Sequence, residues 1–202
     1  MFDKDAWIKI LSKKLPGEQA QIRMSPTFRG QITSGSLAKK AAVLALFYPS
    51  EGKLHLVFIK RNEYDGPHSA QISFPGGIRE EGDMSLEDTA LREAREEVGI
   101  DGEIEVLGKL TPLHIPVSNF MVYPFVGWMN FTPVFRPDPS EVQYVVEAAL
   151  EDLLDPSNKD SETLFHHDMP IEAPYYRVGK EKIWGATAMM LSELLQLATS
   201  LR

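Results

Sequence analysis

The stretch from residue 74 to residue 100 decides the fold, and it reads FPGGIREEGDMSLEDTALREAREEVGI. Its second half predicts a helix that begins at Ser85, because Ser85 and Asp88 can form a capping box that satisfies exposed first-turn amides. No proline or glycine follows until Gly99, which stands where a left-handed residue ends many helices. We therefore expect one helix ending near Val98, directly after an acidic turn and a Gly-Gly pair.

Three glutamates of this helix, Glu93, Glu96 and Glu97, share one face because their spacing is i, i+3 and i+4. Like charges at this spacing repel, so the arrangement destabilises the helix unless a cation lies among them. Hard carboxylate oxygens suit Mg²⁺ or Mn²⁺, and zinc fits poorly without cysteine or a nearby histidine. The alternative is a solvated acidic face with Arg92 and Arg95 as counterions. The preceding glycine pair, whose amides can approach an anion, favours the metal site.

The spacing of this stretch matches a known signature. Gly77, five residues, Asp83, eight residues and then the run REAREEVGI at 92–100 resemble the Nudix box, found in hydrolases that act on nucleoside diphosphates linked to another group. The usual box has glutamate in place of Asp83 and one residue fewer before the arginine. The coenzyme A pyrophosphatase branch of the family shares this departure, so the chain resembles that branch most.

The resemblance implies roles for particular residues. It assigns the metal site for Mg²⁺ or Mn²⁺ to one glycine and three glutamates: Gly77, Glu93, Glu96 and Glu97. It also implies that Arg92 orients a glutamate and that Glu93 binds metal or acts as a base. In several Nudix enzymes a glutamate from a downstream loop completes the metal site or acts as base, and Glu141 is the candidate here, with Glu147 second. The alternative for Glu141 is a solvated charge at the end of a loop.

The residues just before the box resemble a second signature of the coenzyme A branch. The matching positions are candidate substrate contacts: Arg61, His68, Gln71 and Phe74. Asp65, Gly66 and Ala70 depart from the signature, and Gly66 replaces an arginine suited to binding phosphate. The implied reaction cuts coenzyme A or a derivative to 3′,5′-adenosine bisphosphate and 4′-phosphopantetheine. ADP-ribose or another nucleoside diphosphate derivative is the alternative substrate, and a nucleotide-sensing module without hydrolysis is the alternative of another class.

Composition limits the remaining classes. The chain has 202 residues, 43% of them hydrophobic, which is enough for one domain with a substantial core. A net charge of −8 argues against a broad nucleic-acid surface, and a small nucleotide is the expected partner. The absence of cysteine excludes disulfides and thiolate nucleophiles. The charged start and the lack of a long apolar run predict a cytoplasmic protein that makes no membrane contact.

Periodicity predicts the organisation of the chain. Residues 1–40 form a helix at about 3–15 and then an extended arm, which can pack on the domain or on a second subunit, so a homodimer stays open. Residues 41–202 form the catalytic domain. Its expected strands lie at 41–48, 54–60, 72–74, 103–110, 120–131, 142–149, 175–178 and 182–184, with a last helix from about 185 to 200. Strands around one central and one late helix predict an α/β fold, a Nudix-type α/β/α sandwich with a mixed β-sheet.

Overall fold

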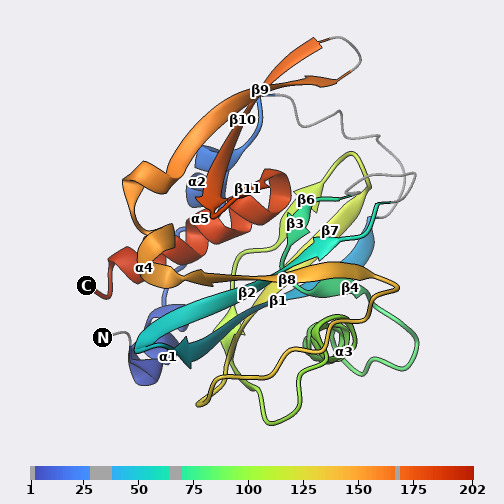
Figure 1. Ribbon diagram of the computed structural model, residues 1–202, viewed down its shortest axis with the longest axis vertical. Coiled ribbons are helices and arrows are strands. Elements are labelled where there is room, and N and C mark those ends of the chain that lie inside the picture. The colour runs from blue at the N-terminus through green and yellow to red at the C-terminus, as the bar shows by residue number, and fades with distance from the viewer. Residues whose placement is uncertain (1–2, 28–37, 64–69, 167–168) are drawn as a thin grey trace.

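The computed structural model of the chain describes residues 3–27, 38–63, 70–166 and 169–202. Figure 1 shows a large twisted sheet in the middle, with α3 below it and α5 above it, and a smaller sheet that extends away from α5. The prediction of a mixed sheet between helices is therefore confirmed.

The large sheet has eight strands in the order β3-β2-β1-β7-β5, and β4, β6 and β8 pair with β1, β7 and β2 respectively. Strands β1 and β7 run parallel, and the other described pairs are antiparallel. The bounds are β1 (Lys39–Ser50), β2 (Lys53–Arg61), β3 (Ile72–Ser73), β4 (Gly76–Ile78), β5 (Glu105–Lys109), β6 (Leu113–Ile115), β7 (Phe120–Trp128) and β8 (Val142–Ala149).

The helices and the small sheet complete the structure. The helices are α1 (Lys4–Leu11), α2 (Glu18–Gln21), α3 (Leu86–Val98), α4 (Leu150–Leu153) and α5 (Gly185–Thr199), with 3₁₀ turns η1 (Ile22–Met24) and η2 (Pro156–Asn158). The small sheet has the order β11-β10-β9, from β9 (Lys159–His166), β10 (Met169–Val178) and β11 (Glu181–Trp184). Within the described ranges, no helix combines the length and the apolar character needed to cross a membrane.

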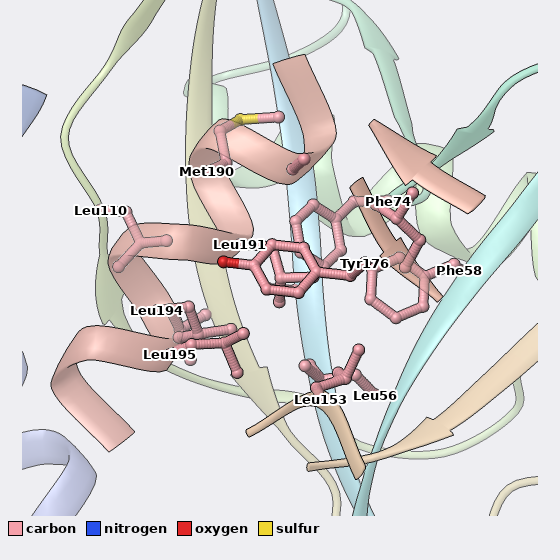
Figure 2. Packing of buried hydrophobic residues seen from close by; sticks show 14 of the residues in the cluster. Leu56, Phe58, Phe74, Leu110, Leu153, Tyr176, Met190, Leu191, Leu194 and Leu195 are labelled. Carbon is pink, nitrogen blue, oxygen red and sulfur yellow. The ribbon is translucent and has the colours of Figure 1, made fainter. Parts of the chain in front are cut away.

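Strand β1 separates two hydrophobic cores because its side chains alternate between the faces of the sheet. Leu44 and Leu46 are fully buried against α3, whereas Phe47 packs in the larger core on the α5 side. Figure 2 shows that larger core, in which Phe74 and Phe58 lie beside leucines of α5. One face of the sheet therefore supports the acidic helix, and the other face anchors the C-terminal helix.

The N-terminal segment differs from the extended arm predicted for residues 16–40. Helix α1 already ends at Leu11, and residues 18–24 form α2 and η1. Trp7 is fully buried and lies 4.7 Å from Phe47, measured between ring centroids. The prediction of an extended arm was wrong for residues 18–24, because contacts with α5 stabilise a helix that is too short to form on its own.

Glu193 of α5 makes the central contact with this segment. Its carboxylate is fully buried and accepts hydrogen bonds from the Gly17 amide at 3.0 Å and the Gln21 amide side chain at 3.0 Å. It also accepts bonds from the Thr111 amide at 3.1 Å and the Thr111 hydroxyl at 2.7 Å. One buried side chain thus joins α5, the N-terminal segment and the end of β5, and four donors satisfy it.

Replacing Glu193 should therefore be costly. We expect Glu193→Ala to lower the free energy of unfolding by roughly 3–5 kcal/mol, because several buried donors lose a charged acceptor. Urea unfolding measures this loss. The exposed Glu151→Ala is the control and should change stability by less than about 0.5 kcal/mol. A loss at Glu193 as small as at Glu151 would show that water replaces the carboxylate without cost.

Candidate active site

Helix α3 forms where the sequence predicts it. The Ser85 hydroxyl accepts the Asp88 amide at 3.1 Å and donates to the Asp88 carboxylate at 3.0 Å, so Asp88 binds the Ser85 hydroxyl rather than the Ser85 amide. Gly99 ends the helix with φ 59° and ψ 46°, and its amide donates to the Arg95 carbonyl at 3.0 Å. Local capping signals therefore fix both ends of the helix that carries the three glutamates.

Glu97 is the most buried of these glutamates, with 1% of its surface exposed. Its carboxylate accepts the Gly76 amide at 2.7 Å and pairs with Arg61 at 3.1 Å. The pKa of Glu97 is raised to about 7, chiefly by burial and in smaller part by the nearby charges of Glu93 and Glu141, against the opposing effects of Arg61 and the Gly76 amide. A proton or a cation is therefore favoured at this carboxylate near neutral pH.

Glu93 lies one turn earlier, against the glycine pair. A Cβ added at Gly77 would lie 2.4 Å from the Glu93 carboxyl group, so only glycine permits this close approach. Burial raises the pKa of Glu93, the adjacent Arg92 opposes the shift, and the charges of Glu96 and Glu141 add to it. Glu93 and Glu97 are thus two desolvated carboxylates that face the same Gly-Gly strand.

Arg92 contacts three acidic side chains of the site. Its guanidinium holds Asp83 with two parallel bonds of 2.9 and 3.0 Å, and it also pairs with Glu93 at 3.0 Å and Glu96 at 2.8 Å. The Ile78 carbonyl accepts a further bond at 3.2 Å. Arg92 therefore orients Glu93 and Glu96 from a position fixed by Asp83.

Asp83 is itself held in place. It accepts the Thr89 hydroxyl at 2.8 Å and the Glu80 amide at 2.9 Å. The hydrogen bonds from Arg92 hold the pKa of Asp83 well below its usual range, so it stays a carboxylate. The sequence placed Asp83 and Arg92 in one motif, but the contact between them needed the structure.

Glu141 reaches this group from the loop before β8. The loop is fastened to the end of α3, since the Arg136 amide donates to Val98 at 2.9 Å and the Asp138 amide donates to Glu97 at 3.1 Å. The Glu141 side chain is exposed, and its charge acts on both Glu93 and Glu97. The second candidate, Glu147, lies farther along β8 and accepts the Tyr48 hydroxyl at 2.7 Å.

The predicted substrate contacts divide in three ways. Arg61 reaches the site through its ion pair with Glu97, and the Gln71 carbonyl accepts the Arg61 amide at 3.1 Å. Phe74 is not brought to the site, because it is 1% exposed and stacks on Phe58 in the core on the α5 side. His68 lies outside the described residues. The Gly76 amide, which binds Glu97, was missed, although the adjacent glycines were the available signal.

The carboxylate oxygens of the three glutamates are ligands of the kind that a hard divalent cation prefers. Among the described residues no group of three histidine, aspartate or glutamate side chains stands close enough together to hold a metal ion. Arg92 is paired with two of the three glutamates, Glu93 and Glu96. Two desolvated carboxylates on one helix face nevertheless repel each other, and a divalent cation would remove that repulsion. Metal binding by Glu93, Glu96 and Glu97 near Gly77 stays a prediction.

The fold is an α/β sandwich. Its carboxylate cluster lies between β4, which carries the glycine pair, and α3, whose Arg92 pairs with two of the glutamates. The sequence model of the NUDIX domain matches residues 38–177, and the chain belongs to this family.

Two relatives and one solved structure illustrate the similarity. The chain is 36% identical over 163 residues to "Nudix hydrolase 15, mitochondrial" of Arabidopsis thaliana, a match that covers 76% of this chain and 56% of the relative. It is 32% identical over 142 residues to the "Uncharacterized Nudix hydrolase NudL" of Photorhabdus laumondii, which covers 70% of this chain and 75% of the relative. The chain spans little more than half the length of the plant relatives it matches. A MutT/nudix family protein from Enterococcus faecalis has the same fold, with a TM-score of 0.56, 17% identity, and coverage of 85% of this chain and 66% of that protein.

Proposed function

We propose that this chain hydrolyses a phosphoanhydride bond in a nucleoside diphosphate derivative, with Mg²⁺ or Mn²⁺ as the cofactor. One observation carries the proposal: the buried carboxylate of Glu97 and the partly buried carboxylate of Glu93 both face the glycine pair. A binding module gains nothing from two desolvated charges that repel each other. An enzyme that must hold divalent cations against a pyrophosphate does gain from them.

Each side chain has a task in this reaction. Divalent cations bound by Glu93, Glu96 and Glu97 would neutralise the phosphates and lower the pKa of a bound water. Arg92 keeps Glu93 and Glu96 in position, and the Gly76 amide fixes the rotamer of Glu97. Glu141 is the proposed base, because its carboxylate is exposed and close enough to act electrostatically on the site. Glu93 is the alternative base.

We further propose coenzyme A or one of its derivatives as the substrate. The sequence around Arg61 and Gln71 supports this choice, and ADP-ribose or another nucleoside diphosphate derivative is the rival. A nucleotide-sensing role without hydrolysis is the rival of another class. The cytoplasmic location and a homodimer also stay predictions, and the two plant relatives are named as mitochondrial and chloroplastic proteins.

A turnover panel tests the proposal. Purified protein with Mg²⁺ or Mn²⁺ is offered coenzyme A, acetyl-coenzyme A, ADP-ribose, NADH and diadenosine polyphosphates, and the products are identified by mass. Formation of 3′,5′-adenosine bisphosphate from coenzyme A is the expected result. If only another compound of the panel is cleaved, the coenzyme A assignment is wrong and the proposed phosphoanhydride hydrolysis stands. If no compound is cleaved, the result favours a nucleotide-sensing module.

Replacement of Arg92 by lysine tests whether Arg92 holds Glu93 and Glu96 in position. Lysine keeps the charge, but an ammonium group cannot hold Asp83 with two parallel bonds and also reach the two glutamates. We expect kcat to fall by roughly 10- to 100-fold, because small displacements of catalytic groups are costly. The exposed Arg95 of the same helix supplies the control, and Arg95→Lys should leave kcat within about twofold. Equal kcat values for the two variants would show that Arg92 does not position the catalytic groups.

A further inference from the structure

Two cations lie directly opposite each other beside the carboxylate cluster. In the antiparallel ladder of β1 and β4, Ala41 pairs with Ile78 and Ala42 with Gly77. The next step brings Lys40 opposite Arg79, and the Arg79 amide donates to the Lys40 carbonyl at 3.2 Å. Side chains that are directly opposite in such a ladder point to the same face, with Cβ atoms about 4.5–5.5 Å apart.

The face is the one that carries the site. Ala42 is packed in the core beneath α3, and the Cβ direction of Gly77 points at the Glu93 carboxylate. Lys40 lies two residues from Ala42 in β1, and Arg79 lies two residues from Gly77, directly after the end of β4. They therefore share that face at a distance of about 6.6–6.8 Å along the sheet. Both side chains are exposed. The pair therefore flanks Glu93 on the solvent side.

This pair lacks an internal counterion. None of the ion pairs among the described residues includes Lys40 or Arg79. The Arg79 guanidinium donates to the Asp83 carbonyl at 3.0 Å and leaves its other donors to solvent, and Glu80 and Glu81, which follow it, form no ion pair with it. Like charges opposite each other destabilise a sheet. An anion bound between them would reverse that effect.

We propose that Lys40 and Arg79 form a subsite for a phosphoryl group of the substrate that is not part of the cleaved anhydride. Arginine and lysine together suit a phosphomonoester, which has two negative charges and several acceptor oxygens. Met121 and Tyr123 pair with Lys40 and Ala42 in the parallel ladder of β1 and β7, so a partly buried apolar surface continues the same face. The ligand class is a nucleoside diphosphate derivative with an additional phosphomonoester, and this assignment rests on the proposed function.

The test compares substrates that differ only in that group. Coenzyme A and dephospho-coenzyme A differ by one phosphomonoester, and KM is measured for both with Lys40→Gln, Arg79→Gln and the double variant. Each single substitution should raise the KM for coenzyme A about tenfold more than the KM for dephospho-coenzyme A. Lys39→Gln is the matched control, because it removes the same charge from the same strand on the opposite face, and the ratio of the two KM values should not change.

Equilibrium binding separates this subsite from the proposed reaction. Calorimetry gives the affinities of the wild type and the variants for 3′,5′-adenosine bisphosphate and for AMP without any turnover. A preference for the bisphosphate that disappears in the Lys40 and Arg79 variants and persists in Lys39→Gln supports the subsite, even if coenzyme A is not cleaved. A wild type without this preference, or equal losses in all three single variants, overturns the subsite even where coenzyme A is cleaved.

Discussion

Replacing Glu97 by glutamine is expected to abolish turnover and to stabilise the cation-free protein at the same time. Glutamine keeps the shape of the side chain, and its carbonyl oxygen can still accept the Gly76 amide. The variant lacks the carboxylate that would bind a divalent cation. Since such a cation supplies several kcal/mol of transition-state stabilisation, kcat should fall by about 10³-fold or more.

The stability change follows from the raised pKa of Glu97. The folded protein holds this proton up to about pH 7, whereas the unfolded chain releases it near the ordinary value of 4.5. The wild type without cations therefore loses stability as pH rises from 4.5 to 7, and the loss is complete above pH 7. Glu97→Gln escapes this loss. It should be about 2 to 3 kcal/mol more stable at pH 8, and the difference should disappear below pH 4.5.

Urea unfolding at several pH values in EDTA measures this difference. Glu96→Gln is the control for stability, because the Glu96 side chain is 57% exposed and its replacement should change the free energy of unfolding by less than about 1 kcal/mol. Mg²⁺ should stabilise the wild type more at pH 8 than at pH 6 and leave Glu97→Gln unchanged, since the cation competes with the proton. Equal stability of the wild type and Glu97→Gln at pH 8, or turnover by the variant, would contradict the account.

Gly99→Ala is expected to produce a large loss of stability, about 3 kcal/mol or more. Alanine at a φ of 59° costs about 1–2 kcal/mol in backbone energy. Its Cβ would also lie 2.0 Å from the Arg136 carbonyl oxygen. That carbonyl cannot move freely, because the Arg136 amide is bound to Val98 and the next turn is bound to Glu97. Relief of the clash displaces the loop that leads to Glu141, so kcat should fall as well.

Gly179→Ala isolates the steric part of this effect. Gly179 has a φ of 57°, and no atom lies within 4 Å of an added Cβ, so only the backbone cost applies. The difference between the two variants in urea unfolding gives the energy of the contact with Arg136. If both variants lose the same free energy of unfolding, the loop at Arg136 moves away without cost. Gly99 would then not control the position of Glu141.

The elements that local signals define were predictable from the sequence. The cap at Ser85 and the left-handed Gly99 give α3 its ends, and β8 begins and ends at the predicted residues. The short β6 was not predicted, because it lies in a proline-rich loop and forms only through pairing with β7. Similarly, α2 depends on Glu193, which is far away in sequence.

The sequence was sufficient to predict which face of α3 carries the site. Spacing alone showed which three glutamates lie together, but their separate environments depend on how closely α3 approaches the sheet. Gly77 makes room for the Glu93 carboxyl group of α3, whereas Gly76 makes room for the β1 backbone at Ala42 and Val43. In that arrangement Glu97 is buried and Glu96 is exposed. The partner of Glu97, Arg61, comes from β2 and could not be inferred from the motif.

The parallel pairing of β1 with β7 also has a consequence for biosynthesis. Residues 39–47 align with residues 120–128, and β4 and α3 lie in the connection between them. A parallel pair can close only after its whole crossover has been made, and such distant contacts form late in folding. A nascent chain that has not yet reached Phe120 therefore lacks the strand that completes the sheet under α3. If the glutamates bind a divalent cation as proposed, they would therefore reach their final positions for it only after the domain is complete.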